Sequence, residues 1–306
     1  MILELGAGHR YETTHRAVVI GVVAAPRAPG AGPRDAVPPD AVPPDGVAEH
    51  PPPAVVASAE RLLAEGADAI EIAGPGPGRV GEPPSPRAVA RLQEAVAVVR
   101  GRLGVPVAVT SADPVVWLAA AAAGATVAVL PVGSAPSQAD PGAPSRVERW
   151  VATWVEALSL CAQGGAAVVL AHHGSAWPGE VRAELGRAAA AAGDRGVARH
   201  RVLLDDGLGH GKSGPQCLAL LRSADGLAAL GHPASMAVDA RLLPPVPGKP
   251  GFHDERAAHV LGLAKGCRVL RTADPRAARR SAHIVAALLE ERATGRPRAT
   301  HGTVAL

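Results

Sequence analysis

Short apolar runs alternate along the chain with longer segments of helical periodicity. The run at residues 17–23 reads A-V-V-I-G-V-V, and its length and β-branched residues predict a strand buried on both faces. Residues 54–66 have helical spacing and end at a glycine. The same pattern predicts further strands at residues 69–73, 105–110, 126–130, 166–171, 202–204, 234–238 and 268–271. It predicts further helices at residues 86–103, 114–123, 145–163, 179–192, 216–230, 253–265 and 275–292.

The order of these elements defines the fold class. Eight strand and helix pairs within a chain of 306 residues are typical of an α/β protein with the (β/α)₈ barrel (TIM barrel) fold. An open, doubly wound sheet is the alternative that the same alternation permits. We expect a single domain at residues 17–293, preceded by an N-terminal extension at 1–16 and followed by a loose tail at 294–306.

A proline-rich stretch interrupts the alternation after the first predicted strand. Residues 24–53 contain the near-repeat D-A-V-P-P-D-A-V-P-P-D and show no periodic apolar face, so they predict a long, flexible loop. Because this loop follows the carboxyl end of a strand, it is either a lid or an insertion.

Composition narrows the classes of function. The net charge is +3, and the arginines are scattered without interleaved aromatic residues, which does not favour nucleic-acid binding. The three cysteines are widely spaced and form no C-x-x-C motif, so they predict neither a disulfide framework nor a zinc knuckle. No apolar run at the N-terminus has the length of a signal or membrane segment. We therefore expect a cytoplasmic protein with no membrane partner.

The most informative stretch is R-V-L-L-D-D-G-L-G-H-G-K at residues 201–212, where a buried strand ends in two carboxylates, three glycines and a lysine. In a barrel, the residues at the carboxyl ends of the strands surround the active site. Asp205 is suited to accept hydrogen bonds from the ring N–H and amino groups of a heterocycle, or it fixes the glycine turn and the next helix. The stretch is not a nucleotide phosphate loop, because Asp206 stands where that motif requires its first glycine.

Other strand ends supply cations and histidines. In the predicted barrel, Lys212, Arg241 and Arg271 converge on an anion, although surface arginines without a role are common in a chain this rich in arginine. Neighbouring residues on a strand face opposite sides, so His172 and His173 cannot bind one ion together unless the strand ends between them. The sequence predicts no metal site from histidine spacing.

The segment L-D-D-G-L-G-H-G-K at 204–212 resembles the L-D-P-G-x-G-F-G-K signature of dihydropteroate synthases. Further segments are similar to other strands of that family: V-I-G-V-V at 19–23, L-A-E-G-A-D-A-I-E-I-A-G at 63–74, V-A-V-T-S-A-D-P at 107–114, V-L-A-H-H-G at 169–174 and R-V-L-R-T-A-D at 268–274. The resemblance implies a (β/α)₈ barrel, usually a homodimer, that joins p-aminobenzoate to a dihydropterin pyrophosphate with the help of Mg²⁺.

The resemblance also implies roles for individual residues. Asp205 matches the aspartate that holds the pterin ring, and Arg271 matches the arginine that meets the pyrophosphate. The other substrate-binding candidates are Glu71 in place of an aspartate, His172 on the fifth strand, Lys212 at the end of the signature, and Arg241 in place of a lysine. Arg79 is a weaker match to an arginine on the p-aminobenzoate side.

Several family positions are replaced in this chain. Ala24 stands at the asparagine of the metal-binding loop, Thr110 at the aspartate of the third strand, and Ala273 at the closing histidine. Val129 and Leu130 stand for an Asn-Asp pair. Each lost polar partner costs about 1 to 3 kcal/mol of ligand binding. We therefore expect a family member whose activity is lost or strongly altered; the alternatives are a non-catalytic homologue that binds a ligand or partner, and an enzyme acting on a different heterocycle.

Overall fold

The computed structural model describes residues 2–6, 8–13, 16–23, 52–75, 84–111, 113–133, 155, 157–208, 210–238 and 255–294. The proline-rich stretch before residue 52, the predicted tail beyond residue 294 and the start of the helix predicted at 145–163 lie outside these residues. Residues 157–164 within that helix are helical.

Eight parallel strands close into a barrel in the order β10-β3-β4-β5-β6-β7-β8-β9. These strands are β3 (Val18–Val23), β4 (Ala69–Ala73), β5 (Val107–Thr110), β6 (Val127–Val132), β7 (Ala167–His172), β8 (Val202–Asp205), β9 (Ala234–Ala237) and β10 (Cys267–Thr272). Because β10 pairs with both β3 and β9, the sheet has no free edge, and the predicted (β/α)₈ barrel is confirmed over the open sheet.

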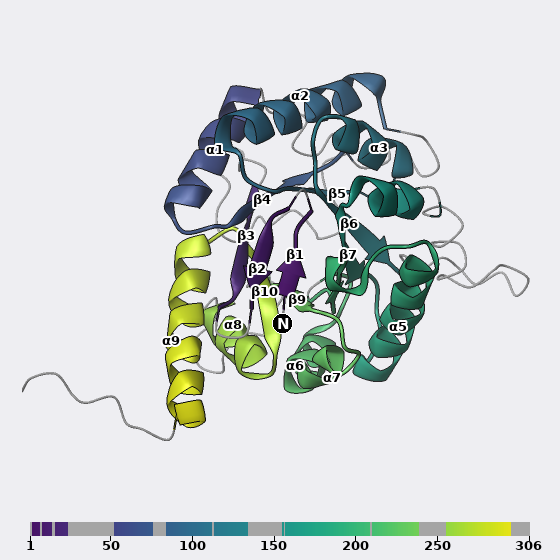
Figure 1. The fold of residues 1–306 in the computed structure, drawn as a ribbon. Helices are drawn as coiled ribbons and strands as arrows, with labels where there is room; N and C mark the ends of the chain where they lie inside the picture. The colour runs from purple at the N-terminus through teal and green to yellow at the C-terminus, as the bar shows by residue number, and fades with distance from the viewer. Residues whose placement is uncertain are drawn as a thin grey trace, which may run out of the picture.

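Helices follow the strands and surround the barrel (Figure 1). They are α1 (Pro52–Ala64), α2 (Pro86–Leu103), α3 (Pro114–Ala122), α5 (Pro178–Asp194), α6 (Gly214–Arg222), α7 (Asp225–Ala228), α8 (Glu255–Ala264) and α9 (Pro275–Thr294), with a short 3-10 helix at Arg199–Arg201. Local sequence sets their ends: the Ser85 hydroxyl accepts the Ala88 amide at 3.2 Å at the start of α2, which ends at Gly104 in the left-handed conformation. One prediction was wrong, because the helix expected at 216–230 is divided into α6 and α7.

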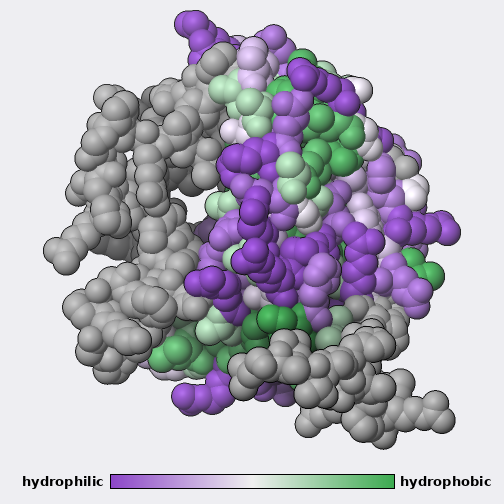
Figure 2. All heavy atoms as spheres, turned by 90° about the vertical axis from the view of Figure 1, so that its left-hand side faces the viewer, coloured by the Kyte–Doolittle hydropathy of each residue, from purple (hydrophilic) through white to green (hydrophobic). Residues whose placement is uncertain are grey.

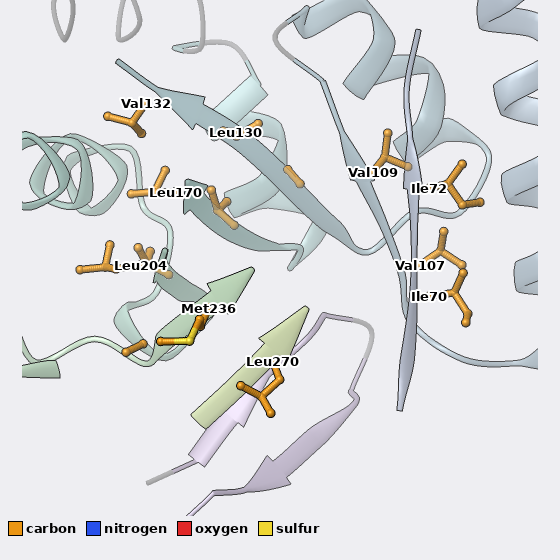
Figure 3. Packing of buried hydrophobic residues seen from close by; sticks show 14 of the residues in the cluster. Ile70, Ile72, Val107, Val109, Leu130, Val132, Leu170, Leu204, Met236 and Leu270 are labelled. Carbon is orange, nitrogen blue, oxygen red and sulfur yellow. The ribbon is translucent and has the colours of Figure 1, made fainter. Parts of the chain in front are cut away.

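The larger hydrophobic core lies between the strands and the helices. Figure 3 shows the strand side chains that contribute to it, among them Ile70 and Ile72 of β4, Leu170 of β7 and Leu270 of β10. These residues alternate along each strand with residues that face the barrel axis. Strands covered on both faces read as continuous apolar runs, which is the pattern seen in the sequence.

A second core fills the interior of the barrel. It contains the inward residues of the strands, such as Val18, Val129 and Val169, together with Leu3 and Leu5 from before the barrel. Leu3 and Leu5 belong to the hairpin region formed by β1 (Ile2–Glu4) and β2 (Arg10–Glu12), which are antiparallel. Figure 1 shows this hairpin within the ring of helices. The N-terminal extension is thus packed into one end of the barrel, and it reaches the same core as the strands.

The outer surface of the helices is mixed. Figure 2 shows the face that carries α1 and α9, where hydrophilic side chains cross the middle and hydrophobic areas lie above and below them. Ile284 and Leu288 of α9 are more than half exposed. Within the described residues, no helix combines the length and the hydropathy needed to cross a membrane.

Candidate functional site

Polar side chains form a layer inside the barrel at the carboxyl ends of the strands. Glu71 of β4, Thr110 of β5, Asp205 of β8, Ser235 of β9 and Arg271 of β10 come from five strands and are joined by hydrogen bonds. Thr110 and Asp205 end their strands and Arg271 is one residue from the end of β10, whereas Glu71 is in the middle of β4 and Ser235 is the second residue of β9. All five occupy the alternate positions that face the axis. The carboxyl end is the end of a (β/α)₈ barrel at which ligands bind.

Arg271 lies at the centre of this polar layer. Its guanidinium donates from Nε to Glu71 Oε2 and from Nη2 to Glu71 Oε1, both at 2.7 Å, and from Nη1 to Asp205 Oδ2 at 3.0 Å. The side chains of Arg271 and Glu71 are each 5% exposed and that of Asp205 is fully buried. The bidentate geometry on Glu71 is the strongest form of an arginine–carboxylate pair.

Asp205 accepts two further hydrogen bonds. Its Oδ2 accepts the Ser235 hydroxyl at 3.0 Å, and its Oδ1 accepts the amide of Gly207 at 2.9 Å. Gly207 has a φ of 63°, and a Cβ there would lie 1.8 Å from the carbonyl oxygen of His172. Glycine is therefore required at this position, because any other residue would clash with β7.

The ion pairs determine the protonation states in the layer. Burial opposes ionisation of Asp205 and Glu71, but the charge of Arg271 and the hydrogen bonds that the carboxylates accept together outweigh it and lower the pKa of both carboxyls. Burial likewise opposes the charge on Arg271, and Glu71 and Asp205 together raise its pKa above the ordinary value. The three groups are all charged at neutral pH, so this part of the layer carries one net negative charge.

Lys212 and His172 form a second cluster on the outer side of the barrel wall. Lys212 Nζ lies 3.1 Å from each of His172 Nδ1, the His172 carbonyl oxygen and the Gly207 carbonyl oxygen. His172 is fully buried, and its Nε2 lies 3.4 Å from Oε2 of Glu184 in α5. Burial lowers the pKa of Lys212 to about 8. Gly207 connects the two clusters, since its amide contacts Asp205 and its carbonyl contacts Lys212.

Asp206, the residue after β8, is a buried carboxyl with an unusual pKa. It is 3% exposed, and burial and the neighbouring charge of Asp205 raise its pKa to about 7. Its Oδ1 has no hydrogen-bond partner among the residues that the structure describes. Asp206 is thus, with Lys212, a group of this region that changes charge near neutral pH.

Two partly exposed histidines lie beside the polar layer. The rings of His173, which follows β7, and His210, in the loop between β8 and α6, stack with centroids 4.5 Å apart and an interplanar angle of 10°. Burial lowers the pKa of both, and the charge of Arg271 lowers the pKa of His210 further. Both rings are therefore neutral at pH 7.

The structure thus brings together three of the residues proposed from the sequence, Glu71, Asp205 and Arg271. It places the other two that it describes, His172 and Lys212, behind the barrel wall, where the hydrogen-bond partners given for Lys212 differ from those of Arg271. Arg79, Arg241 and Ala24 lie outside the described residues.

Sequence reasoning missed Ser235 and the histidine stack. Ser235 follows the start of β9 in an A-S-M-A segment that carries no motif, and the register Asp205↔Ser235 between β8 and β9 places the two side by side. His210 replaces the phenylalanine of the L-D-P-G-x-G-F-G-K signature, so the departure from the signature was its available signal.

The described residues contain no group of three histidine, cysteine, aspartate or glutamate side chains placed to hold a metal ion. Glu71 and Asp205, the carboxylates that line the interior, both bind Arg271. The side chain of Ala24, which lies outside the described residues, carries no donor atom. The residues that the structure describes do not form a Mg²⁺ site, and we derive no step through this ion.

A closed (β/α)₈ barrel with an ion-paired polar layer at the carboxyl ends of its strands defines the class of barrel proteins that bind small molecules at that end. The model of one such family, described as pterin binding enzyme, matches residues 37–241. The chain belongs to this family.

Solved structures agree with the assignment. The dihydropteroate synthase of Thermus thermophilus is 27% identical, with a TM-score of 0.66 over 94% of this chain and 100% of that one. The Xanthomonas albilineans synthase is 25% identical, with a TM-score of 0.64 over 94% and 98%. The Coxiella burnetii synthase, at 20% identity, has a TM-score of 0.69 over 95% and 99% and shows the shared fold. No curated protein sequence matches the chain.

Proposed function

We propose that the chain binds a pterin-like heterocycle in the polar layer, and that the synthase reaction is lost or strongly altered. The observation that carries the proposal is the setting of Asp205. This carboxylate is ionised and fully buried, and Ser235 and Gly207 fix its orientation at the end of β8. A buried carboxylate of this kind is suited to ring N–H and amino donors.

Family membership supports the ligand class. The Thermus thermophilus synthase has been solved in complex with 6HMPPP, and it is 26% identical to this chain. The Xanthomonas albilineans synthase has been solved with 4-aminobenzoic acid. These ligands belong to those proteins, and they identify the compounds to test first.

Two residues that replace polar family positions, Thr110 and Val129, support the proposal of a lost or altered reaction. Thr110 stands where the family pattern has an aspartate, so this position offers no carboxylate to a ligand. Its hydroxyl is donated to Glu71 Oε1 at 2.6 Å. Val129, at the fourth strand, belongs to the inner hydrophobic core. A pterin ring in this layer therefore lacks two polar partners that the family pattern provides. Two such losses reduce binding or turnover by a factor on the order of 100 or more.

The contacts of the two buried cations, Arg271 and Lys212, also support a lost or altered reaction. A pyrophosphate leaving group needs cationic partners, but Arg271 is bound to two carboxylates, and Lys212 is bound to His172 and two carbonyl oxygens. In this arrangement neither cation is available to stabilise the charge that develops on a departing anion. These contacts support the proposal that the chain binds a ligand without catalysing the condensation.

A second candidate is an enzyme that acts on a different heterocycle. The stacked His173 and His210 favour it, because both rings are neutral at pH 7 and lie beside the polar layer. A neutral imidazole can accept a proton from a bound substrate.

The test is a synthase assay with 6-hydroxymethyl-7,8-dihydropterin pyrophosphate and p-aminobenzoate, with the Thermus thermophilus synthase as the positive control. We expect turnover at least about 100-fold below the control. Turnover equal to the control would contradict the loss of activity. Release of pyrophosphate without p-aminobenzoate would show an altered reaction on the same heterocycle.

A further inference from the structure

The guanidinium of Arg271 occupies the carboxylates that a heterocycle would need. It is 5% exposed, and it uses three N–H groups on Glu71 and Asp205, while Ser235 and Gly207 bind the same Asp205. Asp205 Oδ2 accepts two donors and Oδ1 accepts one. A ligand ring cannot take the place of Arg271 on Oδ2 until the guanidinium leaves.

Arg271 and a pterin ring present the same donor pattern. The 2-amino group and the neighbouring ring N–H of a 2-amino-4-oxopteridine are attached to one carbon atom, as the nitrogens of a guanidine are. Both are planar and offer parallel N–H donors at the spacing of two carboxylate oxygens. The Arg271 guanidinium therefore offers the carboxylates the same N–H donors as the edge of a pterin ring.

We infer that the carboxylates of Glu71 and Asp205 together form a binding site for planar groups with guanidine-like N–H donors, and that the Arg271 guanidinium fills this site until a ligand displaces it. A heterocycle with such donors binds by displacing Arg271, so this residue sets both the affinity and the specificity of the site. The extension to pterins rests on the proposed function; the selectivity for guanidine-like groups does not.

The displacement has an electrostatic consequence. Glu71 and Asp205 lose their cation when Arg271 leaves, and two uncompensated carboxylates in a buried site are strongly unfavourable. An incoming ligand must restore N–H donors to both. Cationic amidines restore both the donors and the positive charge, neutral rings with an N–C–N edge restore the donors alone, and anions without such an edge restore neither.

The first test removes the occupant and supplies a small replacement. Arg271→Ala leaves the two carboxylates, and methylguanidinium is the probe, with thermal unfolding as the readout. We expect methylguanidinium to raise the Tm of the variant by about 4 °C or more at a hundredfold excess over its Kd. The wild type, whose site is filled, shows no such rise. Methylammonium at the same ionic strength is the control, because it carries the same charge but lacks the planar N–H groups of a guanidinium.

A second variant keeps the test decisive if Arg271→Ala does not fold. Arg271→Ala combined with Glu71→Gln removes one of the two uncompensated charges and retains Asp205. Methylguanidinium should stabilise this variant as well, and adding Asp205→Asn should abolish the effect. Equal effects of methylguanidinium and methylammonium, or no effect on either variant, would overturn the inference.

The final test measures pterin affinity by titration calorimetry in the wild type and in Arg271→Ala/Glu71→Gln. We expect the variant to bind at least tenfold more tightly, because no resident group must be displaced. Binding to the wild type that weakens in the variant would overturn the inference and leave the proposed function intact. Stabilisation by methylguanidinium with no pterin binding to either protein would contradict the proposed function and support the inference.

Discussion

The two ends of the barrel both contain buried carboxylates paired with arginine, but in opposite proportions. At the hairpin end, Glu4 pairs with Arg10, Arg201 and His200. At the carboxyl end of the strands, one arginine, Arg271, is shared by two carboxylates. The first end therefore has more positive than negative partners, and the second has a net negative charge.

Asp68 repeats the pattern at the hairpin end. Its carboxylate pairs with Arg16 and Arg279 and accepts the amide of Val19 at 2.9 Å. Arg16 is 60% exposed. An arginine that reaches the solvent keeps most of its hydration, so such a pair is formed at little cost and contributes little.

The polar layer around Arg271 has no such contact with the solvent. All three charged groups are almost completely buried, and each depends on the others. The difference teaches that the carboxylates at the hairpin end have arginine partners that reach the solvent, such as Arg10 and Arg16, whereas the charges of the polar layer have only one another as ion-pair partners within the described part of the chain. Four predictions test this contrast, in order of decreasing effect.

Arg271→Met should have the largest effect on stability. It leaves Glu71 and Asp205 buried without a cation, which costs about 3 to 5 kcal/mol of the free energy of unfolding. The matched change at the other end, Arg16→Met, should cost less than about 1 kcal/mol because that side chain is exposed. Urea unfolding followed by circular dichroism measures both. Equal losses would contradict the distinction between the two ends.

Leu5→Ala should destabilise the protein by about 2 to 5 kcal/mol, because it opens a cavity in the inner core. Ile2, in the same hairpin, is 58% exposed, and Ile2→Ala is the control. The control should change the free energy of unfolding by less than about 0.5 kcal/mol. If Leu5→Ala were as mild as the control in the same urea titration, the hairpin would not be part of the core.

Lys212→Met should cost about 1 to 3 kcal/mol, because the carbonyl oxygens of His172 and Gly207 lose their donor in a buried site. Lys265→Met removes an exposed pair with Asp225 and serves as the matched control. It should change stability by less than about 1 kcal/mol. A Lys212 variant as stable as the Lys265 variant would show that the amine does not hold the loop to β7.

Asp206→Asn should change the pH dependence of stability. The pKa of Asp206 is raised to about 7 in the folded protein, so the folded state binds more protons than the unfolded state between about pH 4 and 7. This carboxyl therefore makes stability fall as the pH rises through that window. The asparagine variant should lack this fall and should be about 1 to 2 kcal/mol more stable than the wild type above pH 7.

Urea unfolding at a series of pH values measures the Asp206 effect, and Asp225→Asn is the control. The pKa of Asp225 is lowered, chiefly by its hydrogen bond from Lys265, so its contribution changes below the window. A wild-type curve that rises between pH 4 and 7 to the same extent as that of Asp206→Asn would contradict the prediction.

Much of the fold was predictable because it depends on local pattern. Apolar runs bounded by glycine and proline gave every barrel strand, and the bounds of β4 and α2 agree with the predicted ranges. The hairpin was not predicted, because strands of three residues are too short to show a period. The break between α6 and α7 was also missed, since apolar spacing continues across it.

The candidate site was predictable in part. Strand ends and the family resemblance identified Glu71, Asp205 and Arg271 as site candidates, but their partners depend on barrel closure, which places β10 beside β3 and β9. The sequence therefore suggested that Arg271 and Lys212 share an anion. In the structure each is bound to internal acceptors, on opposite sides of the wall. The roles of these residues in ligand binding remain predictions.

The most direct test of the central claim is a calorimetric titration of 6-hydroxymethylpterin into the wild type and Asp205→Asn, with Asp225→Asn as the control at an exposed aspartate. We predict saturable binding to the wild type and the control, and a loss of affinity of at least about tenfold in Asp205→Asn, because the buried carboxylate is the partner of the ring. Equal affinity of the wild type and Asp205→Asn, or no binding to the wild type, would contradict the account.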